Sequence, residues 1–452
     1  MIAPARIAAY NILCAVSSGR SDVATAVAAS RPSLRDSRDR ALAAEIALGV
    51  QRWRGKLDYL IAHYGKRPID RLDPEVLEIL RLGAYQLLHL TRVPAAAVVH
   101  DGVNLTRRAG KPRAAGLVNA VLRAVSRNRR ALPLPARPRD PSDREPALDY
   151  LSIALSHPRW LVERWYDRLG PERTEEWLVF NNRPAPLTLR ANRPRQTRDR
   201  LLDDLTANGI SARPGHYAPD ALIVDDGQAL HTHGSSERGF VIQDEASQLV
   251  TLLAGPHPGP LVLDACASPG GKATALAATL EGQEWVVACD VRRRRIELLH
   301  RTLVSTGASN VRIIQGNLEV GLPFTDRFSC VLVDAPCSGL GILRRDPDIR
   351  WRRQPHDLIA LADAQRRMLG HAADCVTRGG RLVYATCSSE PEENEDVVDQ
   401  FLRDSPRFVA LDARHAHPAL PAETVDPHGH MRTTPDQHGL EAFFGAVFQR
   451  TG

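Results

Sequence analysis

The sequence lacks the features of a membrane protein and of a disulfide-linked fold. No apolar run approaches the roughly 20 residues of a membrane-spanning helix, and the start, MIAPARIAAYNILCAV, has no small-residue cleavage site after a continuous apolar stretch. The seven cysteines are odd in number and form no CxxC pair, which argues against a disulfide framework and a zinc ribbon. We therefore expect a cytoplasmic protein that binds neither a membrane nor a metal.

Acidic charge is scarce in the first third of the chain. Residues 1–146 contain 25 lysines and arginines against 13 acidic residues, and the remainder contains 34 against 40, so a net charge of +12 is followed by one of −6. A basic region attracts polyanions through counterion release, although basic surfaces also serve solubility alone. The charge pattern favours nucleic acid binding.

A chain of 452 residues is too long to fold around one hydrophobic core, and the spacing of its apolar residues changes along its length. Apolar residues recur every three or four positions over 42–53, 76–87 and 117–125, which predicts helices. Asp73 is placed to cap the second of these, and Pro74 suits its first turn.

A proline-rich stretch, RALPLPARPRDPSDREP (130–146), resists both helix and sheet and predicts a linker. After it, HPRWLVERWYDRLG is typical of a helix, APLTLRAN of a strand, and 197–208 of another helix, as in a small α/β module. We expect a helical domain, a linker, a middle module and a last domain, at 1–135, 136–146, 147–235 and 236–452.

The last domain alternates helical stretches with five short apolar runs, as a doubly wound parallel sheet does. The runs are GPLVLDAC, EWVVACD, VRIIQG, FSCVLVDAP and GRLVYATCS, and the second predicted strand ends at Asp290. In such sheets ligands bind where the strands end. The first run is followed by DACASPGGKAT, in which Asp264 ends the strand, Gly270 and Gly271 let the backbone approach a ligand, and a helix begins near Lys272. This segment is therefore a candidate cofactor loop.

Two common kinds of cofactor loop do not fit. A phosphate-binding Walker loop needs glycine at 266 and serine or threonine after the lysine, where this chain has Cys266 and Ala273. The GxGxxG spacing of dinucleotide loops is absent. A methyl-donor site remains, and Asp290, 26 residues after Asp264, could accept hydrogen bonds from both ribose hydroxyls of S-adenosylmethionine. The alternative for Asp290 is a helix cap.

Two thiols follow two successive apolar runs, in VLVDAPCSGLG and LVYATCSSEPEEN. If those strands are neighbours, Cys337 and Cys387 open into one cleft, although either alone could serve packing, as we expect of Cys266. Attack by a thiolate on carbon 6 of cytosine activates carbon 5 for methylation, and a second thiol could assist product release. The two thiols therefore indicate methylation of cytosine.

The motifs DACASPGGK, VLVDAPCSGLGILRRDPDIRW and YATCSSEPEEN resemble those of the RNA (cytosine-5) methyltransferases of the Sun/Fmu type. DRALAAEIALGVQRWRGKLDYLI and GLVNAVLRAV resemble the helical domain of the antitermination factor NusB, and SHPRWLVERW with RPAPLTLRAN resembles the family's middle module. The order of these three domains resembles that of the bacterial family members that act on 16S ribosomal RNA. It implies an all-α NusB-like domain, a small α/β module and a Rossmann-like class I methyltransferase domain, acting as a monomer.

The resemblance also implies roles for individual residues. Cys387 would be the nucleophile, Cys337 would help release the product, and Asp334 would bind the cytosine edge near the cofactor. Lys272, one of four lysines in the chain and the only one after Lys111, would supply a compact positive charge. The residues implied to surround S-adenosylmethionine are Cys266, Ala267, Ser268, Pro269, Gly270, Gly271, Lys272, Asp290, Asn317 and Asp334.

The chain departs from the family pattern at two places. Asn317 stands where the family usually has aspartate, a position implied to contact the adenine amino group, and its carbonyl oxygen can still accept that bond. Glu441 and Ala442 replace the aspartate and glycine of a terminal DGFF, where we expect a packed closing strand.

Other functions compatible with the sequence are a non-catalytic RNA-binding or ribosome-assembly factor, methylation of another RNA, and methylation of cytosine in DNA. Enzymes that methylate cytosine in DNA would normally place the nucleophile in the PC motif, with no TCS partner. Incubating each nucleic acid with labelled S-adenosylmethionine, and measuring which one becomes labelled, would distinguish these functions.

Overall fold

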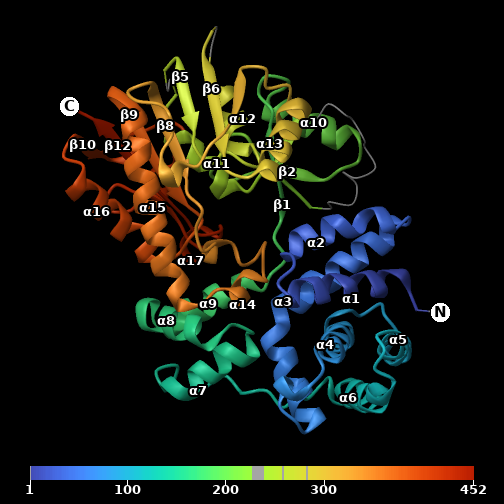
Figure 1. Cartoon of the computed structure of the whole chain (residues 1–452). Coiled ribbons are helices and arrows are strands. Elements are labelled where there is room, and N and C mark those ends of the chain that lie inside the picture. Colours follow the sequence, from blue (N-terminus) through green and yellow to red (C-terminus); the bar gives the residue numbers. More distant parts are fainter. Residues whose placement is uncertain (1, 226–238, 257–258, 281–282) are drawn as a thin grey trace. The chain divides into compact units, whose positions relative to one another are not determined.

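The computed structural model describes residues 2–225, 239–256, 259–280 and 283–452 (Figure 1). They form two compact units. Unit 1 comprises Met1–Pro184 and Leu343–Arg352, and unit 2 comprises Ala185–Ile342 and Arg353–Gly452. A short piece of the later chain thus packs within the N-terminal unit. The predicted boundaries after residues 135, 146 and 235 follow sequence motifs and stay predictions.

Unit 1 is helical, as predicted. The three periodic segments lie in α3 (Ser37–Gly65), α4 (Pro74–His89) and α6 (Ala115–Asn128). Their apolar faces meet in one core, to which Ile46, Leu80 and Leu122 contribute fully buried side chains. The other α-helices are α1 (Pro4–Ser17), α2 (Val23–Ser30), α5 (Ala95–Arg108), α7 (Arg144–Asp149), α8 (Arg159–Leu169), α9 (Pro171–Asn181) and α14 (Ile349–Arg352).

Two local predictions in unit 1 need correction. Pro74 does occupy the first turn of α4, but the side chain of Asp73 caps no backbone amide. Its carboxylate instead lies 3.3 Å from Nζ of Lys111, whose positive charge attracts it. The predicted linker is irregular over 132–138, as its prolines require, but its last residues already belong to α7.

Unit 2 contains a small antiparallel sheet of order β2-β3-β1-β4. The strand predicted in APLTLRAN is β1, and the helix predicted over 197–208 is α10. Both predictions are confirmed. These elements are β1 (Leu187–Ala191), α10 (Arg198–Ala207), β2 (Ala212–Pro214), β3 (Ala221–Val224) and β4 (Phe240–Ile242).

The second sheet of unit 2 has the order β10-β12-β9-β8-β5-β6-β7, with β11 beside β12. The five strands predicted from apolar runs are parallel, and the last three of the chain are antiparallel additions. The doubly wound fold is confirmed, as a mixed sheet. Its strands are β5 (Leu261–Asp264), β6 (Trp285–Asp290), β7 (Val311–Gln315), β8 (Phe328–Asp334), β9 (Val376–Thr386), β10 (Phe408–Leu411), β11 (Met431–Thr433) and β12 (Phe443–Arg450).

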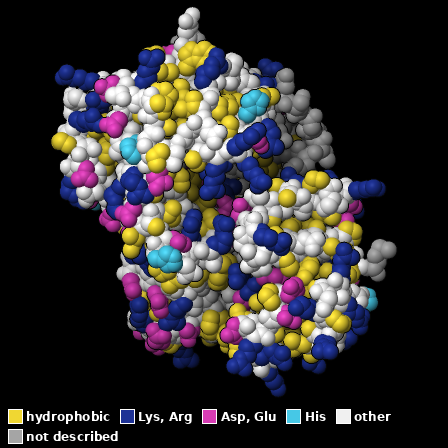
Figure 2. All heavy atoms as spheres, viewed as in Figure 1, with side chains coloured by type: hydrophobic (Ala, Val, Ile, Leu, Met, Phe, Trp, Pro, Cys, Tyr) yellow, Lys and Arg dark blue, Asp and Glu magenta, His cyan; other side chains and the backbone are white. Residues whose placement is uncertain are grey.

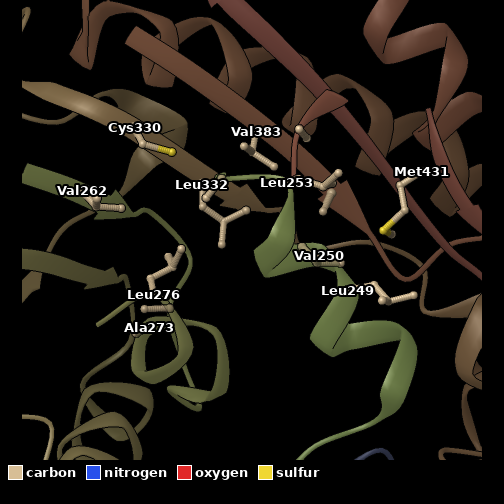
Figure 3. Close-up of a cluster of buried hydrophobic side chains, with 14 of the residues drawn as sticks. Leu249, Val250, Leu253, Val262, Ala273, Leu276, Cys330, Leu332, Val383 and Met431 are labelled. Carbon is tan, nitrogen blue, oxygen red and sulfur yellow. The ribbon is translucent and has the colours of Figure 1, made fainter. Parts of the chain in front are cut away.

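Alternate side chains of the central strands enter two cores, because neighbouring residues of a strand point to opposite faces. Val262, Leu332 and Val383 meet α11 and α12 in one core (Figure 3). Leu263 and Val333 belong to the other core, which α15 and α16 complete. The helices of this domain are α11 (Glu245–Leu252), α12 (Gly271–Ala277), α13 (Arg293–Thr306), α15 (Pro355–Cys375), α16 (Glu395–Asp404) and α17 (Pro435–His438).

The strand order fixes where a ligand can bind. The chain runs outward from β5 to β6 and β7 on one side, and to β8 and β9 on the other, so the order reverses between β5 and β8. The carboxyl ends of these strands therefore form the edge at which such folds bind ligands. Within the described ranges, every helix is too short or too polar to span a bilayer.

Candidate active site

The cofactor loop begins at the end of β5 and turns into α12. Gly270 caps this helix with φ of +108°, in the left-handed region, and a Cβ there would lie 3.0 Å from Leu299. Only glycine adopts this conformation without strain. The predicted helix start near Lys272 is confirmed, since α12 begins at Gly271.

Arg190 of β1 holds the start of α12. Its guanidinium donates to the carbonyl of Gly271 at 2.5 Å and to the hydroxyl of Thr274 at 2.7 Å, and also to Gln243. Burial lowers the pKa of Arg190 to about 10, so these acceptors offset a real desolvation cost. We did not predict this role from the sequence, although a charged residue inside an apolar strand is a visible signal.

Lys272 and Asp334 form an ion pair at the strand ends. Nζ of Lys272 donates to Oδ2 of Asp334 at 2.6 Å. Burial lowers the pKa of Lys272, but the carboxylate of Asp334 outweighs it and the net shift is upward, with Cys387 adding to it. Lys272 is therefore a permanent positive charge beside one of the two thiols.

Asp264 lies beside this pair without a normal hydrogen bond. It is fully buried, and neither carboxylate oxygen has a partner of ordinary geometry in the described structure. Burial raises its pKa to about 7, Asp334 adds to the shift, and Lys272 and the Cys266 amide oppose it. Such an orphaned acid suits a cationic ligand, which would stabilise the carboxylate.

Asp290 ends β6 as predicted and ties the cofactor loop to the next strand. It is buried, and its carboxylate accepts hydrogen bonds from the amides of Ser268 and Arg292, each at 3.3 Å. The residue that caps α13 is Arg292, so Asp290 is not the helix cap that its position also allowed. Each carboxylate oxygen keeps a lone pair for a further donor, such as a ribose hydroxyl.

Asn317 follows β7, and its side-chain oxygen accepts a hydrogen bond from the amide of Glu319 at 3.0 Å. Glu319 itself pairs with Arg367 at 2.5 Å, which favours Asn317 as the residue that faces an adenine. The oxygen of Asn317 has a second lone pair. The contact with adenine stays a prediction.

The two thiols of the sequence motifs are in contact. Cys337 and Cys387 follow β8 and β9, which are neighbouring parallel strands, and their sulfur atoms lie 3.2 Å apart. The hydrogen bond to Cys387, followed by burial, raises the pKa of Cys337 well above its usual value. Cys337 therefore keeps its proton and can donate it to the sulfur of Cys387.

A buried glutamate holds both thiol loops. Oε1 of Glu393 accepts the amide of Ser338 at 2.7 Å, and Oε2 accepts the hydroxyl of Ser388 at 2.5 Å. Each serine follows one of the cysteines directly in sequence. Gln365 of α15 donates to Glu393 and to the carbonyl of Pro336, both at 3.0 Å. The acid run in SEPEEN was the only sequence signal for this clamp.

Two further contacts fix the backbone at the thiols. The amide of Gly341 donates to the carbonyl of Cys387 at 3.0 Å, and Ala442 donates to the carbonyl of Gly341 at 3.0 Å. A Cβ on Gly341 would lie 2.1 Å from the oxygen of Ala442, so only glycine fits. The closing strand β12, which starts directly after Ala442, is packed against β9 as expected.

The predicted residues thus gather at one edge of the sheet. The acids, Lys272 and the thiols all follow the carboxyl ends of parallel strands, and the backbone of Ala267 bonds to that of Cys289 in β6 at 2.8 Å. Burial raises the pKa of Cys266, so its thiol stays protonated and suits packing. Contacts to a cofactor by Cys266, Ala267, Ser268 and Pro269 stay predictions.

Comparison with known proteins identifies the class of this site. A family model described as 16S rRNA methyltransferase RsmB/F matches residues 250–449, the NusB family matches 3–127, and the ferredoxin-like domain of RsmF/B-like methyltransferases matches 157–231. Together with the relatives below, these matches show that the chain belongs to the RsmB/F family of 16S rRNA methyltransferases.

The similarity spans nearly the whole chain. Ribosomal RNA small subunit methyltransferase B of Pseudomonas putida is 34% identical over 98% of this chain and 97% of its own. The probable methyltransferase B of Bacillus subtilis is 32% identical over 92% and 91%. The crystal structure of a methyltransferase homologue from Pyrococcus horikoshii, 26% identical, covers 68% of this chain and 99% of its own with a TM-score of 0.58.

The pKa of Asp264 predicts how Asp264→Asn changes stability. With a pKa of about 7 in the folded protein, against an ordinary value of 3.8, the wild type loses stability as pH rises from about 4 to 7. The variant should escape this loss. Between pH 5 and 8 its advantage in unfolding free energy should grow by roughly 2–3 kcal/mol, measured by urea unfolding. An advantage that does not change with pH would contradict the assignment.

Proposed function

We propose that the protein transfers the methyl group of S-adenosylmethionine to carbon 5 of a specific cytosine in 16S ribosomal RNA, through a covalent cysteine–cytosine intermediate. The observation that carries this proposal is the contact between the thiols of Cys337 and Cys387 at the end of two parallel strands. Family membership and the names of the relatives support the RNA substrate.

Cys387 is the nucleophile in this proposal. Its thiolate attacks carbon 6 of cytosine, which makes carbon 5 an enamine carbon able to take a methyl group. Lys272 lies close enough for the charge of Cys387 to raise the pKa of its ammonium, so a cation stands beside the attacking sulfur. Asp334 is partly exposed and can bind the edge of the base while it pairs with Lys272.

Cys337 serves the end of the reaction. After methylation, the proton on carbon 5 must leave and the bond between sulfur and carbon 6 must break. Cys337 enters this stage as a protonated thiol in contact with the sulfur of Cys387, and it can pass a proton to that sulfur as it departs. Water accepts the carbon 5 proton, the C5–H electrons form the double bond between carbons 5 and 6, and the electrons of the bond from carbon 6 to sulfur leave with Cys387.

The residues present fit S-adenosylmethionine, which supplies an electrophilic methyl group on a sulfonium cation. Asp264 is a buried acid that lacks a cationic partner of its own, Asp290 can accept from the ribose, and Asn317 from the adenine. Gly270 and Gly271 give the loop its close approach. The remaining loop residues proposed to line the cofactor are Cys266, Ala267, Ser268, Pro269 and Lys272.

The basic surface of unit 1 is proposed to bind the RNA, with the protein acting as a monomer in the cytoplasm. Figure 2 shows Lys and Arg side chains gathered over the end of unit 1 that contains α6. Arg123 and Arg127 of α6 are exposed and four residues apart, hence on one helix face. They are placed to contact phosphates.

Single substitutions distinguish the proposed roles of the two thiols. Cys387→Ala should abolish methylation and leave S-adenosylmethionine binding within about twofold of the wild type, because this thiol meets the base. Cys337→Ala should accumulate a covalent RNA adduct, visible as a slow band on a denaturing gel with labelled RNA. The double variant is the control, and an adduct formed equally well without Cys387 would refute the assignment.

The salt dependence of RNA binding tests the basic surface. Replacing Arg123 and Arg127 with glutamine should reduce the slope of log affinity against log salt by about 1.4, the value for two lost phosphate contacts to single-stranded RNA. The same double change at the exposed Arg378 and Arg403 of unit 2 is the matched control. An equal fall in both variants would mean that the RNA is not bound mainly by α6.

A further inference from the structure

The segment Leu343–Arg352 belongs to unit 1, although the residues on both sides of it belong to the catalytic unit. It starts directly after the loop of Cys337 and ends directly before Arg353. The chain therefore passes from unit 2 to unit 1 and back again, and the contacts that hold the segment in unit 1 explain why.

Arg350 anchors the segment in unit 1. Its side chain is fully buried and donates to Asn182 at 2.9 Å and to the carbonyls of Ser156, Asn181 and Leu343 at 3.2–3.3 Å. These acceptors come from three separate parts of the sequence. Only the assembled unit brings them together.

No carboxylate pairs with Arg350 in the part of the chain that the structure describes. Burying an unpaired guanidinium costs several kcal/mol, and an apolar residue of similar size would fill the space more favourably. The hydrogen bonds must offset this cost. Arg350 is therefore better suited to fix a geometry than to supply packing energy.

Neighbouring residues hold the same segment. The indole N–H of Trp351 donates to the carbonyl of Gln51 at 2.6 Å. The guanidinium of Arg52 donates to the carbonyl of Arg344 at 3.0 Å. The first and last parts of the segment are thus bonded to one turn of α3, in unit 1.

Both ends of the segment lead to the thiols. Arg350 holds the carbonyl of Leu343, and two residues earlier Gly341 donates to the carbonyl of Cys387. At the other end Arg353 donates to the carbonyl of Ser338 at 2.9 Å and to that of Cys337 at 3.2 Å. Three residues span at most about 10 Å, which limits how far Arg353 can move while Arg350 stays in place.

We propose that Arg350 is a positioning residue, which sets the geometry of Cys337 and Cys387 from within the helical unit. The step it controls is the use of the two thiols, so the inference rests on the proposed function. The thiol pair would then be aligned only when unit 1 is fully assembled around the segment.

The test compares Arg350→Met, Arg350→Lys and the wild type in the full-length chain. At saturating RNA and S-adenosylmethionine, single-turnover methyl transfer should fall at least tenfold in Arg350→Met and recover in part in Arg350→Lys, which keeps a charged donor. The Kd of S-adenosylmethionine should stay within twofold, because its proposed contacts lie in unit 2. Arg403→Met, an exposed arginine of α16, is the matched control.

A second set of variants covers the case in which Arg350→Met does not fold. Arg353→Met should slow transfer without a change in cofactor affinity. Combined with Arg350→Lys it should cause less than the product of the two single effects, because both act on one backbone segment. Fully multiplicative effects, or a methyl-transfer rate in Arg350→Lys and Arg353→Met equal to wild type, would overturn the inference.

Measurements on the wild-type protein show whether a negative result contradicts this inference or the proposed function. If wild-type protein and Cys337→Ala form neither methylated cytosine nor an RNA adduct, the proposed function is wrong. If they do, and the Arg350 and Arg353 variants behave like wild type, only the positioning role is wrong.

Discussion

The contact between two sulfur atoms depends on one buried carboxylate. Glu393 is fully buried and accepts a hydrogen bond from each of the serines that follow Cys337 and Cys387. A buried carboxylate without hydrogen-bond donors is costly. The hydrogen bonds that remove this cost come from the two loops, so the same bonds hold the loops against Glu393. The sheet brings the loops to one edge, and Glu393 sets their distance.

The site therefore combines two kinds of constraint. Strand order brings Asp264, Asp290 and Asp334 to the edge of the sheet where the order of the strands reverses, between β5 and β8, as in other doubly wound folds. Side chains from distant elements then refine the geometry: Arg190 fixes the start of α12, and Arg350 fixes the chain beyond Cys337. The first constraint defines a methyl-donor fold, and the second makes the proposed two-thiol chemistry possible.

Much of the fold and of the site could be predicted from the sequence, because the spacing of apolar residues indicates the strands, and the glycine, proline and acidic residues after them indicate where the strands end. Each of the five parallel strands, the helix at Lys272 and the neighbourhood of the two thiols follows from local patterns. The roles of Arg190, Glu393 and Arg350 do not. The sequence shows that each residue is charged, but it does not show which distant residues each will bond to. Asp73 shows the converse, where a favourable capping residue makes an ion pair with Lys111 instead.

The rate of covalent adduct formation in Glu393→Gln tests the central claim most directly. The substitution keeps the size of the side chain but removes its charge and replaces one acceptor oxygen with a donor, so the hydrogen bonds to Ser338 and Ser388 that hold the two loops become weaker. In the Cys337→Ala background, adduct formation with RNA should slow by about 100-fold, or roughly 2.7 kcal/mol, with an unchanged Kd for S-adenosylmethionine. An unchanged adduct rate would contradict the account.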